Sequence, residues 1–150
     1  MFERSFISSI GNKDISPKLR TYRLFKINYI HEPYLHLIIP KYRVSLCRLR
    51  TSSHLLEIEK GRHTIPKTPL ERRVCRQCDS NCVEDEIHFV VNCQKHTQLR
   101  TELSNIASIY MSNYFHLNSR EKFTFLLSST EKEVILALAK YCYWAYKHRI

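Results

Sequence analysis

Cysteine and histidine recur at a defined spacing in residues 74–93, VCRQCDSNCVEDEIHFVVNC, and this spacing restricts the folds open to the chain. Cys75 and Cys78 form a CxxC pair, His88 follows after nine intervening residues, and Cys93 follows after four more. A CxxC turn brings two thiolates to one metal ion, and a later His and Cys can complete the tetrahedral shell that zinc prefers. Because protein would fill all four positions, none is left for the activated water of a catalytic zinc. The pattern predicts one structural Zn²⁺ bound by Cys75, Cys78, His88 and Cys93.

The same residues admit other interpretations. Disulfides form in secreted proteins, but the opening MFERSFISSIGNKD has no apolar run long enough for a signal peptide. We therefore expect an intracellular protein, nuclear or cytoplasmic, with reduced thiols. A thioredoxin-like CxxC would follow a long apolar strand, which ERRVCRQCDSNC lacks. Unrelated buried or surface thiols are the third interpretation.

Two further residues compete for places in the ligand set. Cys82 is separated from Cys78 by only three residues and could replace one of the four ligands. His96, beyond Cys93, is a weaker substitute. Cys47 and Cys142 lie in apolar helical patterns and are expected to be small core residues.

Glycine is scarce in this chain. Its only two glycines, Gly11 and Gly61, exclude a glycine-rich phosphate loop and argue against an all-β fold with many tight turns.

A hydrophobic content of 43% in 150 residues is enough for one domain with a buried core. The longest apolar stretches, such as VILALA at 134–139, are far shorter than the roughly 20 residues that span a bilayer. We expect neither a membrane nor a small-molecule substrate as a partner.

The formal charge of +10 is concentrated towards the N-terminus. Residues 1–50 carry ten Lys or Arg against three acids, whereas residues 51–100 carry eight against seven. Basic side chains at helical spacing can neutralise phosphates and release counterions, which predicts binding to the RNA or DNA backbone that weakens steeply with salt. The alternative is that they form the solvated faces of amphipathic helices. The predicted nucleic-acid-binding residues are Arg20, Arg23, Lys26, Arg43, Arg48 and Arg50.

The spacing of apolar residues predicts a mainly α fold, a small helical domain with a zinc-knuckle-like insert. In this insert a CxxC turn precedes a helix that carries His88 and Cys93. We expect one domain overall, in which the C-terminal helices pack on a basic helical segment. Its parts are a flexible N-terminus (1–16), the basic helical segment (17–70), the zinc-binding element (71–97) and the C-terminal helices (98–150).

Proline marks the expected helix starts in the basic segment. Ser16 and Pro17 predict the first turn of a helix over KLRTYRLFKINYI. Pro33 predicts a short helix over PYLHLII, and Pro40 predicts a second helix over YRVSLCRLR. The inward side chains of the second helix are expected to be Val44, Cys47 and Leu49.

Acidic residues crowd the expected start of the ligand-bearing helix. Glu84, Asp85 and Glu86 suit the positive end of the helix dipole, which we favour over a catalytic role. The helix should carry His88 inward, bend near Cys93 and resume through LRTELSNIASIY.

Two capped helices are expected to close the chain. Ser119 can cap REKFTFLLS, and Thr130 with Glu133 predicts a capping box before VILALAKYCYWAYKHR. The buried stripe of the last helix is predicted to be Val134, Leu138, Tyr141 and Ala145.

Ordered blocks along the chain resemble a known family. They are KLRTYRLFK (18–26), EPYL (32–35), RVSLCRLRTSSHLLEIEKGRH (43–63), ERRVCRQC (71–78) and VEDEIHFVVNC (83–93), followed by LR (99–100) and the closing helix LALAKYCYWAYKHR. Together they are similar to the C-terminal region of reverse transcriptases from LINE-type, non-LTR retrotransposons. The resemblance covers about residues 17–150, whereas the CxxC, His, Cys element alone is shared with many zinc knuckles.

The resemblance implies a zinc-binding tail that lies downstream of a polymerase and helps to hold template RNA or target DNA during target-primed reverse transcription. The family's metal ligands fall on Cys75, Cys78, His88 and Cys93. The polymerase portion of the same element would be a further partner. Because no aromatic residue followed by an Asp-Asp pair occurs, and the endonuclease of such elements is also absent, we do not expect an enzyme.

Three functional hypotheses follow. The favoured one is a non-catalytic nucleic-acid-binding module, salt-sensitive and weakly sequence-selective. The second is a zinc-stabilised structural or protein-interaction module whose helical faces dock on the polymerase or on a host protein. The third is a fragment of a decayed element without a function.

Overall fold

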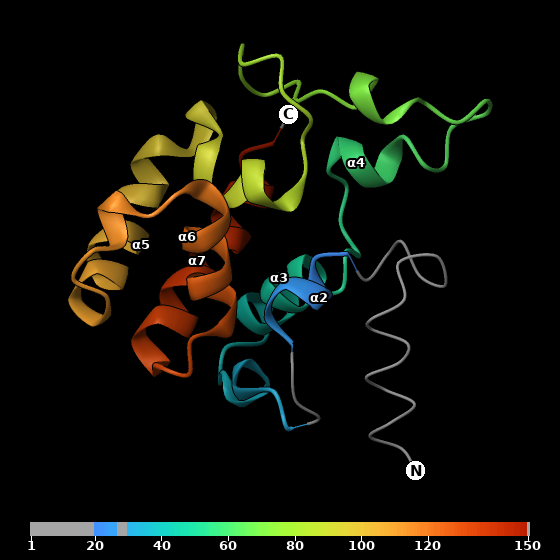
Figure 1. Ribbon diagram of the computed structural model, residues 1–150. Coiled ribbons are helices and arrows are strands. Elements are labelled where there is room, and N and C mark those ends of the chain that lie inside the picture. Colours follow the sequence, from blue (N-terminus) through green and yellow to red (C-terminus); the bar gives the residue numbers. More distant parts are fainter. Residues whose placement is uncertain (1–19, 27–29, 150) are drawn as a thin grey trace.

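A computed structural model of the chain describes residues 20–26 and 30–149 (Figure 1). Its helices and helical turns are α2 (Tyr22–Phe25), η2 (Pro33–His36), α3 (Pro40–Arg50), α4 (Glu57–Lys60), η3 (Leu70–Arg72), η4 (His88–Asn92), η5 (Gln94–His96), α5 (Thr97–Tyr110), η6 (Tyr114–His116), α6 (Ser119–Ser128) and α7 (Lys132–Lys147). The described residues contain no β-strand, and an isolated antiparallel bridge joins Val74 and Val83. The predicted mainly α fold is confirmed.

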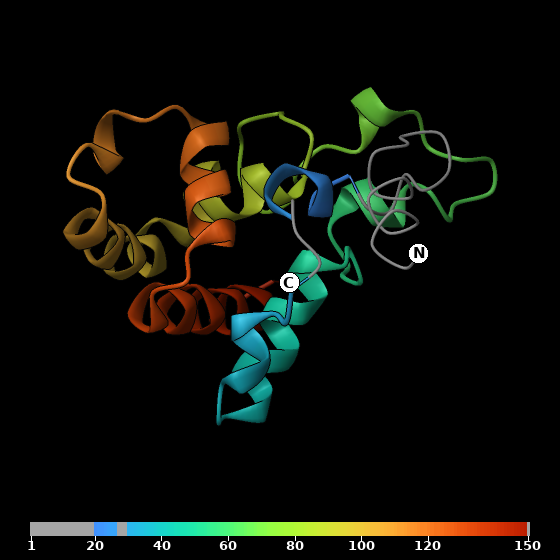
Figure 2. The ribbon, with the colours of Figure 1, turned by 60° about the horizontal axis from the view of Figure 1, so that its bottom comes forward.

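Helix α7 is the centre of the packing. It contacts α3, α5, α6 and η2, and Figures 1 and 2 show α5 and α6 on one side of the molecule, with residues 57–83 extending on the other. This helix is long and apolar along one stripe, so it can bury that stripe against several neighbours at once. The predicted buried stripe is confirmed for all its members: Val134, Leu138, Tyr141 and Ala145.

The helices around α7 supply the other half of the core. Leu46 and Leu49 of α3 and Leu103 of α5 are at most 1% exposed, and Phe123 of α6 is fully buried. Cys142 is buried, as expected for a small core residue, whereas Cys47 is only partly buried. No helix among the described residues is both long and apolar enough to cross a membrane.

Two expectations for the N-terminal half need correction. Within residues 20–26, the helix predicted from residue 18 onward is helical over Tyr22–Phe25 and ends at Lys26, which adopts an extended conformation. Val44 was expected inward but is 45% exposed. At about 100° per residue it lies on the opposite side of α3 from Leu46, which faces the core. The start predicted at Ser16 and the flexible segment 1–16 lie outside the described residues.

The helix starts in the C-terminal half differ from the prediction by one residue. Asn118, not Ser119, caps α6, and it forms a reciprocal capping box with Glu121. Thr130 and Glu133 do not form a box, because the N-cap of α7 is Glu131 and makes no side-chain capping bond. Glu133 instead accepts a hydrogen bond from the hydroxyl of Tyr110 at 2.7 Å.

Candidate metal centre

A short hairpin-like turn presents the CxxC pair. The backbone N–H of Cys75 donates to the carbonyl of Cys82, and that of Glu84 donates to the carbonyl of Arg73, both at 2.9 Å. Asn81 has a φ of 57°, in the left-handed region that asparagine tolerates better than most residues. The chain therefore folds back on itself, and Cys75 and Cys78 both lie in the first half of the turn.

His88 and Cys93 are brought together by an unusual helical turn. The segment His88–Asn92 is a π-helical turn, in which the N–H of Cys93 donates to the carbonyl of His88 at 2.7 Å. In an α-helix, the side chains of residues five apart point about 140° away from each other. A π turn is wider and joins residues five apart by a hydrogen bond, so their side chains lie closer together. The chain then bends at Cys93, whose ψ is 121°, before α5 begins. The predicted bend is confirmed. The π turn was not predicted, although the five-residue step from His88 to Cys93 could have indicated it.

The four predicted ligands form one cluster. The ligand atoms of Cys75, Cys78, His88 and Cys93 all lie within 4.8 Å of one another. The two Sγ atoms of Cys75 and Cys93 are 3.9 Å apart, and Sγ of Cys78 lies 3.4 Å from Nε2 of His88. Three of the four are buried and Cys78 is partly exposed, so the cluster is closed to solvent on most sides. These four residues can hold a metal ion.

Cys82 and His96 lie outside this cluster. Cys82 is exposed, and its thiol lies 3.4 Å from the carbonyl oxygen of Ser80. His96 is 1% exposed and packs edge-on against Phe89 and Tyr141, with neither ring nitrogen hydrogen-bonded. All six cysteines are free thiols, so the disulfide interpretation does not describe this structure.

Arg100 and Tyr141 hold the ligand-bearing turn on the helical core. Arg100, on α5, donates from Nε to the carbonyl of Val90 at 2.8 Å and from a terminal nitrogen to the carbonyl of Cys93 at 2.6 Å. Tyr141, on α7, donates its hydroxyl to the carbonyl of Phe89 at 2.5 Å. Carbonyls left without partners by the irregular turn are thereby satisfied. Sequence reasoning did not assign this role to either residue.

The three acids before His88 have separate roles. Asp85 alone caps the turn, since its carboxylate accepts the N–H of His88 at 2.7 Å. Glu84 is buried, accepts the N–H of Glu57 at 2.8 Å and pairs with Arg149 near the C-terminus. Glu86 is also buried, and it joins a polar network away from the helix end.

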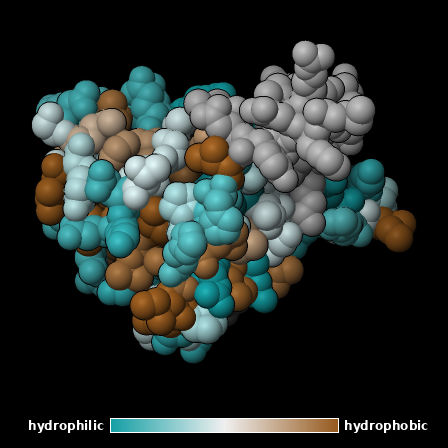
Figure 3. Space-filling model, turned by 90° about the horizontal axis from the view of Figure 1, so that it is seen from below, coloured by the Kyte–Doolittle hydropathy of each residue, from teal (hydrophilic) through white to brown (hydrophobic). Residues whose placement is uncertain are grey.

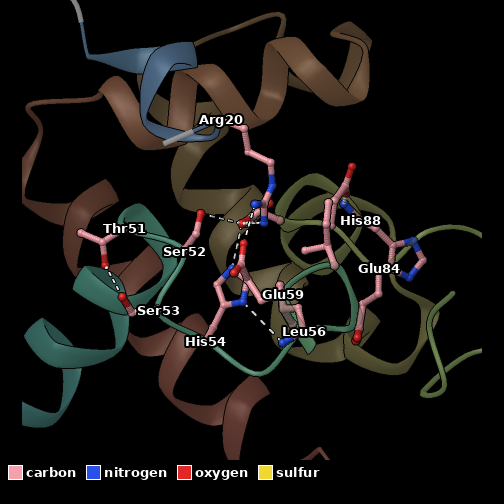
Figure 4. A network of polar contacts seen from close by, with 12 residues as sticks. Arg20, Thr51, Ser52, Ser53, His54, Leu56, Glu59, Glu84 and His88 are labelled. Carbon is pink, nitrogen blue, oxygen red and sulfur yellow. Dashed lines mark hydrogen bonds and ion pairs between the residues drawn. The ribbon is translucent and has the colours of Figure 1, made fainter. Parts of the chain in front are cut away.

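Glu86 is surrounded by donors from distant parts of the chain. One oxygen accepts from Arg20 at 2.6 Å, His54 at 2.8 Å and Ser52 at 3.0 Å. Figure 4 shows the side chains of Arg20, Ser52 and His54 converging. Burial acts to raise the pKa of Glu86, but the His54 hydrogen bond and the Arg20 charge outweigh it and lower the pKa to about 2. Arg20 also binds Glu59, which anchors α4 to the same network.

The thiols of the cluster differ in acidity. Burial raises the pKa of Cys75 to about 12, helped by the nearby Glu84 carboxylate, and burial also raises the pKa of Cys93. Burial acts the same way on Cys78, but hydrogen bonds from Ser80 bring its pKa below the ordinary value. Burial lowers the pKa of His88, which favours the neutral imidazole that binds metals. Metal binding at this site would release protons from the buried thiols.

Two of the predicted phosphate-contacting residues are buried inside the fold. Lys26 and Arg50 bind the two carboxylate oxygens of Glu32 at 2.8 and 2.7 Å. The Arg50 guanidinium also donates to the carbonyl of Leu127 and lies 4.1 Å from the ring centre of Phe25. A phosphate could reach these cations only by displacing Glu32, so their burial indicates a structural role.

The other four residues predicted to bind nucleic acid lie partly inside the fold and partly on its surface. Arg20 belongs to the Glu86 network, and Arg43 donates to the carbonyl of Leu37 at 2.9 Å, between η2 and α3. Arg23 is half-buried in the last turn of α2. Arg48 is exposed on α3. The predicted set therefore does not form a single basic surface.

A groove lies where the ends of α3 and α7 meet α4. Glu84, whose carboxylate lies 3.6 Å from Sγ of Cys75, pairs with Arg149 in the wall of this groove. The groove has a volume of about 1090 Å³. Its basic, acidic and histidine lining residues are Arg48, His54, Glu59, Lys60, His63 and Arg149. Glu59 pairs with Arg20 and Arg62, Lys60 pairs with Glu57, and Arg149 pairs with Glu84. The lining holds three lysine or arginine side chains against one acid, an excess that favours an anion.

Comparisons of this chain with protein-family models, with curated proteins and with solved structures found no match.

Proposed function

We propose that the cluster binds one zinc ion in a structural role. A tetrahedron with zinc–sulfur bonds of about 2.3 Å has sulfur–sulfur edges of about 3.8 Å, and a shorter zinc–nitrogen bond of about 2.0 Å makes the sulfur–nitrogen edges shorter. The separations of 3.9 Å between the sulfurs of Cys75 and Cys93 and of 3.4 Å between the sulfur of Cys78 and Nε2 of His88 match these edges, and all six separations are at most 4.8 Å. Three thiolates and one imidazole favour zinc over hard cations such as Mg²⁺ or Ca²⁺. With four protein ligands the ion has no open position for catalysis.

We infer further that the chain is a non-catalytic nucleic-acid-binding module. The observation that carries this proposal is the groove, whose lining holds Arg48, Lys60 and Arg149 against one acid, Glu59. Arg48 is exposed there, and the Lys60 side chain is 49% exposed and pairs with Glu57 at 3.4 Å, an i,i+3 contact that a phosphate could replace. The acids near the groove are engaged: Glu59 and Glu86 with Arg20, and Glu84 with Arg149. This arrangement suits an anion and offers no free carboxylate pair for catalysis.

The metal cluster supports the groove through short connections. Glu84 and Glu86 lie between Cys75 and His88 in the chain, and they hold Arg149 and His54 in the groove wall. An ion that fixes Cys75 and His88 would therefore fix the groove as well. The proposal agrees with the resemblance to the C-terminal region of non-LTR reverse transcriptases, in which such a tail would contact template RNA or target DNA.

Zinc binding is tested first, by native mass spectrometry of the reduced protein. One zinc per chain is expected for the wild type and for Cys82→Ser, because the exposed Cys82 lies outside the cluster. Cys78→Ser should lose the ion. A folded wild type without zinc would refute the metal assignment, and equal losses in both variants would refute the ligand set.

Phosphate contacts are tested by charge reversal. Arg48→Glu with Lys60→Glu should weaken binding to RNA and DNA oligonucleotides and reduce the slope of log affinity against log salt by about 1.4 to 1.8, the value for two phosphates. The matched control is Arg120→Glu with Lys132→Glu, an equal charge change at exposed positions on α6 and α7. If both pairs behave alike, the groove is not the binding site. A zinc-loaded protein that binds no nucleic acid would favour the structural or protein-interaction module.

A further inference from the structure

Helices α3 and α7 present a row of aromatic rings beside one another. Tyr42 of α3 packs edge-on against Tyr143 of α7, with ring centres 5.5 Å apart. Tyr143 in turn lies 5.1 Å from Trp144, and Trp144 lies 6.1 Å from His148. Trp144 is 40% exposed, although large aromatic residues are usually buried. We call these four rings the aromatic row.

Lysines lie over the faces of this row. Lys41 is 5.1 Å from the ring centre of Tyr42 and 4.9 Å from that of Tyr143. Lys147 is 5.3 Å from the ring of Tyr143 and 6.0 Å from the ring of Trp144. Both lysines are exposed, so each can leave the ring face for an anion at little cost. The surface thus alternates positive charge with flat apolar rings.

The row borders a small cavity. Tyr42 and Trp144 line a space of about 240 Å³ between α5 and α7, together with Lys140 and Glu102. This volume is below the lower limit of about 300 Å³ for sites of drug-sized ligands. It is more suitable for one planar ring than for a larger molecule. Figure 3 shows one face of the molecule, on which hydrophobic residues gather between hydrophilic ones. Exposed large aliphatic side chains include Leu35, Ile38 and Ile39, in and after η2.

We propose that the aromatic row binds the unpaired bases of a single-stranded nucleic acid. Bases would stack on Trp144 and its neighbours, while Lys41 and Lys147 move to the phosphates between them. Trp144 and His148 are exposed, and Tyr42 and Tyr143 are half-buried. Accessible aromatic rings interleaved with cations are the combination by which single strands are held without sequence preference. A duplex hides its base faces and could use only the lysines.

This inference rests on the proposed function, which gives nucleic acid as the class of ligand, and it adds a preference for single strands. The two surfaces share their supporting helices, since Arg48 of α3 and Arg149 after α7 line the groove while Tyr42 and Tyr143 lie earlier along the same pair. A single strand could follow this helix pair from the aromatic row to the groove. The groove supplies phosphate contacts, and the row distinguishes unpaired bases from duplex.

The chain offers a direct reporter, because Trp144 is its only tryptophan. We would titrate the zinc-loaded full chain with oligo(dT) and oligo(U) and follow its intrinsic fluorescence. Heparin serves as a polyanion without bases, and a DNA duplex of equal length serves as a second control. Single strands should quench Trp144, whereas heparin and the duplex should bind with little quenching. Equal quenching by heparin, or binding of single strands without quenching, would overturn the proposal.

Variants separate this inference from the proposed function. Trp144→Ala should weaken binding of a labelled oligo(dT) about 10-fold, within the range for loss of one stacked base, and Trp144→Phe should retain most of the affinity. Duplex binding should be unchanged in both variants, and circular dichroism would verify their folding. Single-strand binding that responds to Arg48→Glu with Lys60→Glu but not to Trp144→Ala refutes the aromatic row alone. Absence of binding to any nucleic acid at low salt refutes both.

Discussion

At the scale of single residues, buried charges are accommodated by partners from distant segments. Glu86 is 2% exposed, and its ionised form is stable because Arg20, Ser52 and His54 direct three donors at one oxygen. The Nδ1 atom of His54 accepts the N–H of Leu56, which leaves Nε2 as the donor to Glu86. Removing one partner leaves an unpaired buried charge. The stability lost in this way is larger than the net stability that the intact network contributes.

Glu86→Gln should therefore lower the free energy of unfolding at pH 7 by about 3 kcal/mol. The pKa of Glu86 falls from 4.5 to about 2 on folding, so its stabilising effect is complete above the unfolded pKa and disappears as the pH falls through the folded pKa. The difference between wild type and variant should shrink between about pH 4.5 and pH 2. Urea unfolding across this range measures it. Glu71→Gln, at an exposed position, is the control, and a difference independent of pH would contradict the network.

At the scale of elements, the π turn brings His88 and Cys93 together, so that both can bind one metal ion. Its irregular backbone is held by Arg100 from α5 and by Tyr141 from α7. Residues that orient metal ligands from outside the ligand shell strongly affect metal affinity. The ligand site thus depends on helices that contribute no ligand.

Arg100→Met should lower zinc affinity about 10- to 100-fold while leaving all four ligands in place. The physical reason is that the carbonyls of Val90 and Cys93 lose their donors and the π turn loosens. Competition with a chromophoric chelator measures the affinity. Arg120→Met changes an exposed arginine on α6 and should have no effect. Unchanged affinity in Arg100→Met would show that the turn holds its shape without this contact.

The helix caps allow a second comparison between elements. Asn118→Ala should destabilise the protein by about 1 kcal/mol, because it removes the acceptor for the N–H of Glu121. Thr130→Ala should change stability much less, since Thr130 does not cap α7. Thermal unfolding of both variants tests this assignment. A larger loss of stability in Thr130→Ala than in Asn118→Ala would support the capping box that the sequence predicted for α7.

At the scale of the whole molecule, the helical core and the metal element are stabilised differently. Helices α3, α5, α6 and α7 bury a continuous apolar core. Residues 73–87 contribute few buried apolar side chains and depend on the cluster, the bridge between Val74 and Val83, and the ion pairs of Glu84 and Glu86. Loss of the metal should therefore act locally.

Removal of zinc by a chelator should increase amide hydrogen exchange in residues 73–93 while α7 stays protected. The same treatment should abolish binding in the groove, because Arg149 and His54 are held by Glu84 and Glu86. Hydrogen-exchange mass spectrometry, followed by readdition of zinc, measures both effects. Uniform exchange over the whole chain would show instead that the core cannot fold without the ion.

Some properties of this protein were determined by its sequence alone. The cluster of Cys75, Cys78, His88 and Cys93 and the buried stripe of α7 depend on spacing within a short segment, so the sequence could predict both. The scarcity of glycine pointed to helices. The use of each charge was decided only by tertiary structure. Arg20 meets Glu86 across 66 residues, and Arg50 meets Leu127 across 77. Such partners cannot be found from periodicity, because burial and pairing depend on which segments the fold brings together. Cys82, whose spacing also suited a ligand, was excluded for the same reason: the turn after Cys78 directs its side chain to solvent.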